Sequence, residues 1–243
     1  MIYGLLSDIH ANLEALEAVL AELGGLNAFL CLGDIVGYGP DPGPCVDRVR
    51  ELPNLTCVAG NHDLAALGHY DIKWFNPYAG QAILWTSGQL SADQKSFLSS
   101  LPLASDVPQA LLVHGSLAEP MAYINTPIEA VQCFDEMPDS LCFVGHTHIA
   151  EYYRQPAETR FCEQVSLWSG GQVTLEPELR YIVNPGAIGQ PRDGNPAAGF
   201  GIYDAEAGVV EVRRVSYDIA GTQEKMRRAG LPDYLIQRLS VGR

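Results

Sequence analysis

The chain has 243 residues, of which 47% are hydrophobic and 18% are charged. These proportions are typical of a globular protein with a substantial core, and they exclude a disordered or fibrous chain. The formal net charge is −14 with only 15 Lys and Arg, which argues against a long nucleic-acid partner because such proteins usually carry a basic surface.

The N-terminal part of the chain alternates predicted strands with predicted helices. From Asn12 to Leu23, leucine and valine recur at helical spacing and Gly24-Gly25 follows, so we expect a helix that Asn12 caps and the glycines end. Apolar runs predict strands on either side. The elements of this part are strands at 2–6, 27–33 and 54–60 and a second helix at 44–52. This succession predicts a mainly parallel sheet and an α/β fold.

The alternation breaks between residues 64 and 101, where two helices are predicted. Ser91-x-x-Gln94 and Thr126-x-x-Glu129 are capping boxes, which mark helix starts. The chain has no internal repeat or low-complexity break, so we expect a single domain over 1–243 with a helical insertion near 64–101. The predicted elements are helices at 77–86 and 92–101, strands at 110–113, 141–144, 150–154, 180–183, 199–203 and 209–217, and short helices near 219–229 and 232–240.

Polar residues directly follow five of the predicted strands. The carboxyl ends of parallel strands meet at one edge of a sheet, so we expect these side chains to gather there. Carboxylate, imidazole and amide ligands without a cysteine favour an open transition-metal site over a structural zinc site. The five stretches are Asp8-Ile9-His10, Gly33-Asp34, Gly60-Asn61-His62-Asp63, His114-Gly115 and Gly145-His146-Thr147-His148.

Spacing within the first and last stretches gives a further expectation. Residues two apart in a strand face the same side. Asp8 is therefore expected to point at the same site as His10, and His146 at the same site as His148.

The series D-x-H, G-D, G-N-H-D, H and G-H-x-H, in this order over residues 8–148, resembles the signature of the calcineurin-like metallophosphoesterases. The resemblance implies a two-sheet sandwich flanked by helices, a four-layer αββα fold. It also implies a hydrolase with two divalent or trivalent transition-metal ions, Mn, Fe or Zn. The implied metal ligands are Asp8, His10 and His148 for the first ion, Asn61, His114 and His146 for the second, and Asp34 as the bridge between them.

The resemblance gives His62 a different role. Its counterpart lies beside the phosphate and protonates the leaving oxygen, as a general acid does. Asp63 follows directly and is expected to orient the ring, as carboxylates do for other catalytic histidines. Asn61, Tyr38 and Arg192 are expected to contact the substrate.

Two departures from the Ser/Thr phosphatase branch concern the substrate. That branch reads G-D-x-V-D-R-G and G-N-H-E, with arginines that hold the phosphate, and both arginines are missing in the stretches 33–39 and 60–65. Arg192, in a Gly/Pro-rich loop, is the best replacement. The stretches 7–12, 37–42 and 184–194 resemble a bacterial group related to diadenosine tetraphosphate hydrolases and small phosphodiesterases. A dinucleoside polyphosphate or a related nucleotide is therefore the expected substrate.

Other interpretations stay open. One is a phosphodiesterase for cyclic nucleotides or aryl phosphodiesters, and another is a non-catalytic scaffold with the same fold, although scaffolds can dispense with His62. Aromatic residues between 74 and 85 either stack on a base or belong to the core. His69 is expected on the surface or in a cap. The sequence leaves homo-oligomer formation open. The aromatic residues of segment 74–85 are Trp74, Phe75, Tyr78 and Trp85.

The expected location is the cytoplasm. No C-x-x-C pair occurs among the six cysteines, and Cys31, Cys57 and Cys142 lie in predicted strands as buried thiols, which fits a reducing compartment. The chain enters its first strand at Ile2 without a signal-peptide pattern, and no apolar run has the length of a membrane span.

Overall fold

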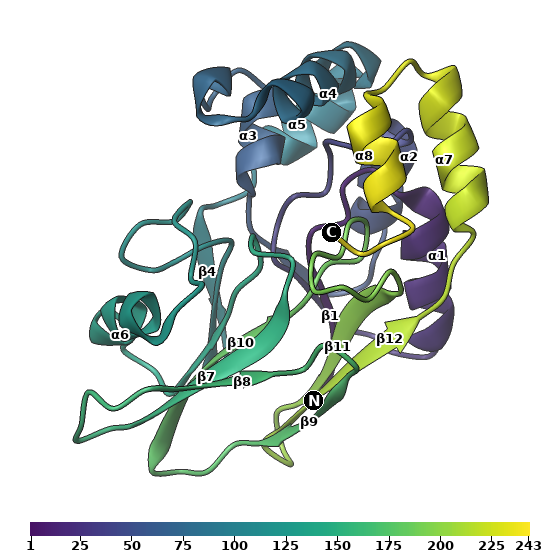
Figure 1. The fold of residues 1–243 in the computed structure, drawn as a ribbon. Helices are drawn as coiled ribbons and strands as arrows, with labels where there is room; N and C mark the ends of the chain where they lie inside the picture. The colour runs from purple at the N-terminus through teal and green to yellow at the C-terminus, as the bar shows by residue number, and fades with distance from the viewer.

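The computed structural model describes residues 1–243 and has two central sheets with helices on their outer faces (Figure 1). The strands are β1 (Ile2–Leu6), β2 (Phe29–Cys31), β3 (Leu55–Cys57), β4 (Ala104–Val107), β5 (Ala110–Val113), β6 (Leu141–Phe143), β7 (Ala150–Pro156), β8 (Glu163–Ser166), β9 (Gly171–Thr174), β10 (Leu179–Pro185), β11 (Ala198–Asp204) and β12 (Val209–Val215). The helices are α1 (Leu13–Glu22), α2 (Pro42–Arg50), α3 (Asn61–Ala66), the 3-10 helix η1 (Ile72–Trp74), α4 (Pro77–Gln89), α5 (Ala92–Ser99), α6 (Pro127–Asp135), α7 (Ile219–Arg228) and α8 (Asp233–Arg238).

Each sheet is mixed and has six strands. The first has the order β3-β2-β1-β11-β12-β9 and the second β4-β5-β6-β10-β7-β8. Strands β1, β2 and β3 are parallel, and so are β5, β6 and β10, whereas the other pairings are antiparallel. Each sheet thus contributes a parallel group whose carboxyl ends carry the predicted site residues.

The core between the two sheets fixes their relative position. Leu5 and Leu30 of the first sheet and Phe143 and Val183 of the second are fully buried in one hydrophobic cluster. Burying a side chain of this size stabilises the fold by about 1.5–3 kcal/mol. The sandwich is therefore held by the same strands that end at the site.

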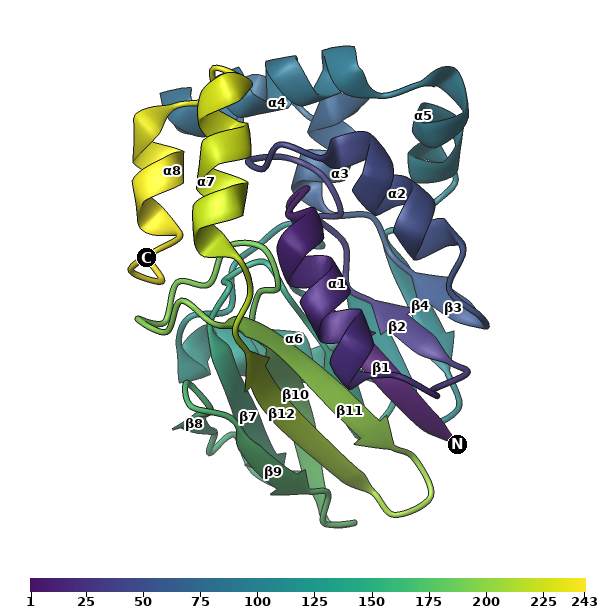
Figure 2. The same cartoon turned by 90° about the vertical axis from the view of Figure 1, so that its right-hand side faces the viewer.

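Helices form the two outer layers. Helices α1, α2 and α5 pack on the outer face of the first sheet, and α6 packs on the outer face of the second through Ala130, Cys133 and Phe134. Helices α4, α7 and α8 form a further cluster that includes Tyr38 and Leu235. Figure 2 shows these helices together with α3 above the ends of the strands. The α/β class and the four-layer arrangement are confirmed.

Local patterns predict the long elements better than the short ones. Both capping boxes form, at Ser91 and Thr126, and the Asn12 side chain caps α1 through the Ala15 amide. Helix α3 and the short strands β4, β8 and β9 are absent from the predicted elements. The three strands have only four residues each and lie at sheet edges or in hairpins, where the partner strand rather than the local sequence decides pairing.

Two compositional expectations can also be compared with the structure. All six cysteines are free, and Cys31, Cys57 and Cys142 are buried as predicted. None of the helices combines the length and the apolar character that a membrane-spanning helix requires.

Candidate metal centre

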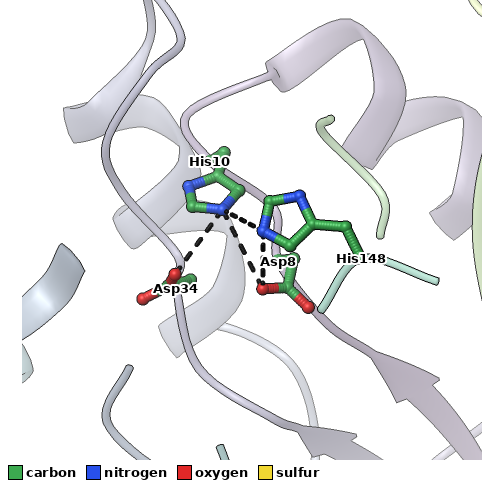
Figure 3. A group of neighbouring side chains, drawn as sticks. All are labelled: Asp8, His10, Asp34 and His148. Atoms are coloured by element: carbon green, nitrogen blue, oxygen red, sulfur yellow. Dashed lines mark hydrogen bonds and ion pairs between the residues drawn. The ribbon is translucent and has the colours of Figure 1, made fainter. Parts of the chain in front are cut away.

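Loops at the strand ends bring the predicted metal ligands together in two adjoining buried clusters. The first contains Asp8, His10, Asp34 and His148, as Figure 3 shows, and the second contains Asp34, His114 and His146. Within each cluster, the candidate ligand atoms lie within 4.8 Å of one another. Asp34 belongs to both.

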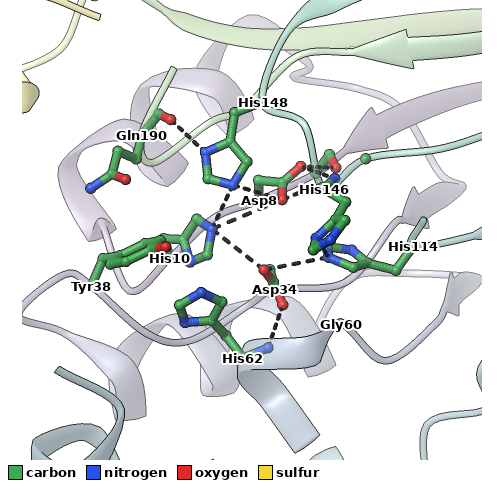
Figure 4. Close-up of polar contacts among 12 residues, drawn as sticks. Asp8, His10, Asp34, Tyr38, Gly60, His62, His114, His146, His148 and Gln190 are labelled. Atoms are coloured by element: carbon green, nitrogen blue, oxygen red, sulfur yellow. Dashed lines mark hydrogen bonds and ion pairs between the residues drawn. The ribbon is translucent and has the colours of Figure 1, made fainter. Parts of the chain in front are cut away.

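The Asp34 carboxylate lies between the two clusters. Its Oδ2 atom is 3.5 Å from His10 Nε2 and 3.4 Å from His114 Nε2, and it is buried without a hydrogen-bond partner. The other oxygen, Oδ1, accepts a hydrogen bond of 2.9 Å from the backbone N–H of His62 (Figure 4). One carboxylate oxygen is thus anchored while the other faces both clusters.

Backbone carbonyls orient three of the imidazoles. The Nδ1 atoms of His10, His114 and His148 lie 3.1, 2.7 and 2.6 Å from the carbonyl oxygens of residues 36, 32 and 190. A carbonyl only accepts hydrogen bonds, so Nδ1 must carry a proton, and whenever the ring is neutral Nε2 presents a lone pair to the cluster. His10 Nε2 and His148 Nε2 are only 3.0 Å apart. Two lone pairs at this distance repel, and a shared cation would relieve the repulsion.

The second cluster also contains the amide of Asn61. Its Oδ1 is 3.2 Å from His114 Nε2, which is in turn 3.0 Å from His146 Nδ1. Asp34 completes this group of oxygen and nitrogen ligands. Together with the unpaired Asp34 oxygen, these oxygen and nitrogen atoms form a set of ligands that could bind metal.

Backbone strain is concentrated in the same loops. Asp8, His10, Asp34, His146 and His148 all have positive φ angles, between 48° and 67°. This conformation is uncommon for residues other than glycine and persists only where the surrounding contacts enforce it. The strain therefore coincides with the candidate ligands.

Spacing alone predicts the grouping of these residues only in part. Asp8 and His10 do share a cluster, but His146 lies with His114 whereas His148 lies with Asp8. Strand alternation does not apply because β1 ends at Leu6 and β6 ends at Phe143, so both pairs stand in loops. His146 and His148 therefore belong to different clusters, which adjoin through Asp34.

Electrostatics in the clusters favour charged carboxylates. Burial alone would raise the pKa of Asp34, but the surrounding histidines outweigh it and hold that pKa well below its ordinary value. Burial similarly opposes a charged His114, yet the carboxylates of Asp34 and Asp8 raise its pKa to about 10. His114 thus carries a proton that a metal ion would displace, since metal ligands must be deprotonated.

His62 lies beside the clusters and belongs to neither. Its ring packs against Tyr38 and Phe75, with centroid distances of 4.4 and 4.9 Å, and its Nδ1 is buried without a partner. Gly37 has a φ of +93°, and a Cβ there would lie 2.4 Å from that Nδ1. Packing therefore sets the ring orientation and leaves Nε2 as the atom available to the cavity. Burial lowers the pKa of His62 to about 4.

The expected role of Asp63 is not supported. Its carboxylate accepts hydrogen bonds from the backbone N–H groups of Gly60 at 3.0 Å and Val36 at 3.1 Å, and none from the His62 ring. Asp63 is the third residue of α3, where a carboxylate caps the free amides of the first turn. It ties α3 to the loop after β2, and burial raises its pKa to about 7.

A cavity of about 260 Å³ opens over the clusters and contains both predicted substrate residues outside the motifs. Tyr38 is almost fully buried, and its hydroxyl accepts a hydrogen bond of 3.1 Å from the Arg192 guanidinium. Asn61 and His62 line the same cavity. The structure thus gathers Tyr38, Asn61 and Arg192 around one space.

Aromatic residues also line the cavity, and those of segment 74–85 divide into two groups. Trp74 and Phe75 line it, whereas Tyr78 stacks on Tyr234 and Trp85 packs in the cluster of α4, α7 and α8. His69 is exposed and lines none of it.

Tyr123 is a cavity residue that the sequence does not indicate. Its ring stacks on His146, with centroids 3.9 Å apart and an angle of 17°, and it lines the cavity. Tyr123 lies in the irregular segment between β5 and α6, where no motif or periodicity distinguishes it from its neighbours.

Known proteins are similar to this chain over most of its length. A model of the calcineurin-like phosphoesterase superfamily domain matches residues 1–208. The uncharacterized protein MJ0912 of Methanocaldococcus jannaschii is 37% identical over 244 residues, which cover 98% of this chain and 97% of that protein.

Two solved structures are similar as well. A metallophosphoesterase from Sphaerobacter thermophilus is 42% identical, with a TM-score of 0.90 and full coverage of both chains. A protein provisionally described as a diadenosine tetraphosphatase has 15% identity and a TM-score of 0.56, covers 88% of this chain and 94% of its own, and shares the fold alone. On the strength of the family model and the close relatives, the chain belongs to the calcineurin-like phosphoesterase superfamily.

Proposed function

We propose that this chain is a dinuclear metal-dependent hydrolase of small-molecule phosphoesters or phosphoanhydrides. The observation that supports it most is the unpaired Asp34 Oδ2, which lies about equally far from His10 Nε2 and His114 Nε2. An oxygen in this position is suited to bridge two ions. Two bound ions would supply a Lewis-acidic site that neutralises phosphate charge and lowers the pKa of water.

In this proposal, the two clusters divide the ions between them. Asp34 contributes to both, and the tautomers fixed by the backbone carbonyls present Nε2 of His10, His114 and His148 to the ions. Asp8, His10 and His148 would hold the first ion, and Asn61, His114 and His146 would hold the second.

His62 acts on the leaving group. Its Nδ1 is blocked by Gly37, so Nε2 is the atom that meets the substrate. Burial keeps the ring neutral at pH 7 in the free protein, and the negative charge of a bound phosphate favours its protonated form. The protonated Nε2 then donates its proton to the leaving oxygen.

A nucleotide, and a dinucleoside polyphosphate in particular, is the proposed substrate. Arg192 can hold a phosphate beyond the one under attack, because it lines the cavity and a guanidinium forms bidentate contacts with phosphate. Trp74 and Tyr123 line the same cavity and are 78% and 47% exposed. Exposed aromatic faces next to a phosphate site are suited to stack on a nucleobase.

Activity on a substrate panel tests the proposal. The protein reconstituted with Mn²⁺ would be assayed on dinucleoside polyphosphates, cyclic nucleotides, bis(4-nitrophenyl) phosphate, phosphomonoesters and phosphopeptides, with an EDTA-treated sample as control. We expect metal-dependent hydrolysis with the highest kcat/KM on a dinucleoside polyphosphate. A preference for cyclic nucleotides or aryl diesters would indicate a phosphodiesterase instead. Preference for phosphopeptides would contradict the substrate assignment, and no hydrolysis with Mn²⁺, Fe²⁺ or Zn²⁺ would indicate a scaffold.

A further inference from the structure

Residues 209–243 lie outside the span of the family model, yet they contact the loop that carries Arg192. We propose that the buried Asp193–Arg214 ion pair and Gly242 position this loop, residues 190–195, and thereby set the affinity for the outer phosphate of the substrate. Both are positioning elements rather than parts of the reacting site. The inference rests on the proposed function for the role of Arg192.

The loop is joined to the metal centre at two points. The Gln190 carbonyl accepts the Nδ1 proton of His148 at 2.6 Å, and the Arg192 backbone N–H donates to the His148 carbonyl at 3.1 Å. A displacement of this loop would therefore move the Arg192 guanidinium.

Asp193 anchors the middle of the loop. It pairs with Arg214 of β12, and the two side chains are only 4% and 7% exposed. The same carboxylate accepts hydrogen bonds from the Ala150 N–H at 3.1 Å and the Asn195 N–H at 3.4 Å. Ala150 begins β7, two residues after His148, so Asp193 connects three segments beside the site.

The buried Asp193–Arg214 pair is better suited to fixing the loop's position than to stabilising the fold. Removing two charges from water offsets most of their attraction, so a buried ion pair is a weak source of stability. The space for the Arg214 guanidinium is nevertheless kept by Gly199, where a Cβ would lie 3.1 Å from Nη1. A pair that contributes little stability but fixes three segments is suited to hold a geometry.

Gly242 holds the far end of the loop. The Gly194 N–H donates to the Gly242 carbonyl at 2.8 Å, and a Cβ on Gly242 would lie 2.6 Å from the Asn195 backbone. Figures 1 and 2 both show the C-terminus beside these loops. The last residues of the chain therefore contact the substrate-side loop directly.

A charge-neutral replacement of the pair tests the proposal without leaving a buried charge. The double variant Asp193→Asn/Arg214→Gln would be compared with Glu211→Gln/Arg213→Gln, which removes an exposed ion pair on the same strand. We expect the first to raise KM for a dinucleoside polyphosphate about tenfold or more, the size expected for a weakened charge-assisted contact, with a much smaller effect on bis(4-nitrophenyl) phosphate. The control double variant should leave both KM values unchanged. Arg214→Lys, which keeps the positive charge, should raise the KM for the dinucleoside polyphosphate less than the double variant does.

Glycine variants provide an independent test that keeps every charge. Gly242 and Gly230 have φ angles of +63° and +69°, but nothing lies within 4 Å of a Cβ on Gly230. Gly242→Ala should raise the same KM, whereas Gly230→Ala should carry only the backbone strain. Equal KM changes for both glycine variants, or equal losses on both substrates in the double variant, would overturn the positioning role.

Binding of inorganic triphosphate separates this inference from the proposed function. If the wild-type protein with Mn²⁺ hydrolyses no substrate, the proposed function fails. Calorimetry on the metal-loaded protein then still measures the affinity for triphosphate, to which the loop contributes. The positioning role predicts that the double variant binds triphosphate about tenfold more weakly than the wild type. It also predicts that this difference disappears when Arg192 is replaced by Ala in both proteins. Equal affinities of wild type and double variant would refute it.

Discussion

Individual side chains at the candidate metal centre are oriented by the backbone around them. Carbonyls of residues 32, 36 and 190 fix three imidazoles, and two backbone N–H groups fix Asp63. His62 differs because its Nδ1 has no hydrogen-bond partner and its ring is held by packing alone. This difference separates His10, His114 and His148, which would hold ions, from His62, which would transfer a proton.

Replacing His62 tests its role as the proton donor. His62→Ala should lower kcat by roughly 10²–10⁴-fold, because it removes the acid that protonates the leaving oxygen. The loss should be smaller for nitrophenyl esters, whose leaving group needs little protonation. Metal content, measured by elemental analysis, should stay near the wild-type value because His62 belongs to neither cluster. A loss of metal would make His62 a ligand instead.

Gly37 offers a sharper test of how His62 is positioned. Gly37→Ala should lower kcat, because the new Cβ would lie 2.4 Å from His62 Nδ1 and displace the ring. Gly25→Ala is the matched control, since Gly25 has a φ of +90°, close to the +93° of Gly37, and nothing within 4 Å of its Cβ. Backbone strain should cost each variant roughly 1–3 kcal/mol of stability, and only Gly37→Ala adds the overlap with His62. Similar kcat values in the two variants would show that packing against Gly37 does not orient His62.

Elements between the parallel strands form the substrate side of the site. The segment from α3 to α4 contributes Trp74 and Phe75, and the segment between β5 and α6 contributes Tyr123. Neither belongs to the sheets, so their side chains are not needed for the sandwich core. Their exposure over the cavity is consistent with contacts to substrate.

Removing the Trp74 ring should weaken nucleotide binding. Stacking on an aromatic side chain contributes about 1–3 kcal/mol per base, so Trp74→Ala should raise KM for a dinucleoside polyphosphate at least several-fold. Hydrolysis of inorganic triphosphate, which has no base, should be unaffected. Trp168→Ala is the control because Trp168 is 56% exposed and lies outside the cavity. An equal effect of the two substitutions would exclude stacking on Trp74.

At the scale of the whole molecule, the metal-free fold contains histidines that burial keeps neutral. Burial lowers the pKa of His62 to about 4 and that of His146 to about 3, whereas unfolded histidine titrates near 6.5. Below pH 6.5 the unfolded chain therefore binds more protons than the fold through these two groups. Asp63, whose pKa burial raises to about 7, opposes this effect by one proton. His114, whose pKa is raised to about 10, takes up no further proton in this range.

The metal-free protein should consequently lose stability as the pH falls from 6.5 towards 4. Stability should also fall above neutral pH, since the folded His114 holds its proton up to about pH 10 and the unfolded one does not. Thermal unfolding in EDTA at pH 4.5, 6.5 and 9 measures how stability changes with pH on the acid and alkaline sides. His62→Gln should reduce the change between pH 6.5 and 4.5, and His114→Gln should reduce the change between pH 6.5 and 9. An unchanged pH dependence in these variants would contradict the assigned titrations.

The sequence by itself determined the ligand types, their order and the α/β class. Each motif follows an apolar run, and parallel strands end at one edge of a sheet, so these patterns alone predict that Asp8, Asp34 and His114 lie near one another. The helix starts at Ser91 and Thr126 likewise follow from residues only three apart. These features depend on short-range periodicity and on capping, which a single sequence contains.

The tertiary structure alone decided which atoms meet. The partners of Asp63 lie on the backbone at Gly60 and Val36 rather than on the His62 ring. Tyr123 stacks on His146, and Arg214 and Gly242 contact the loop that carries Arg192. These contacts join segments far apart in the chain. Such contacts depend on how the two sheets pack, and no local pattern encodes that.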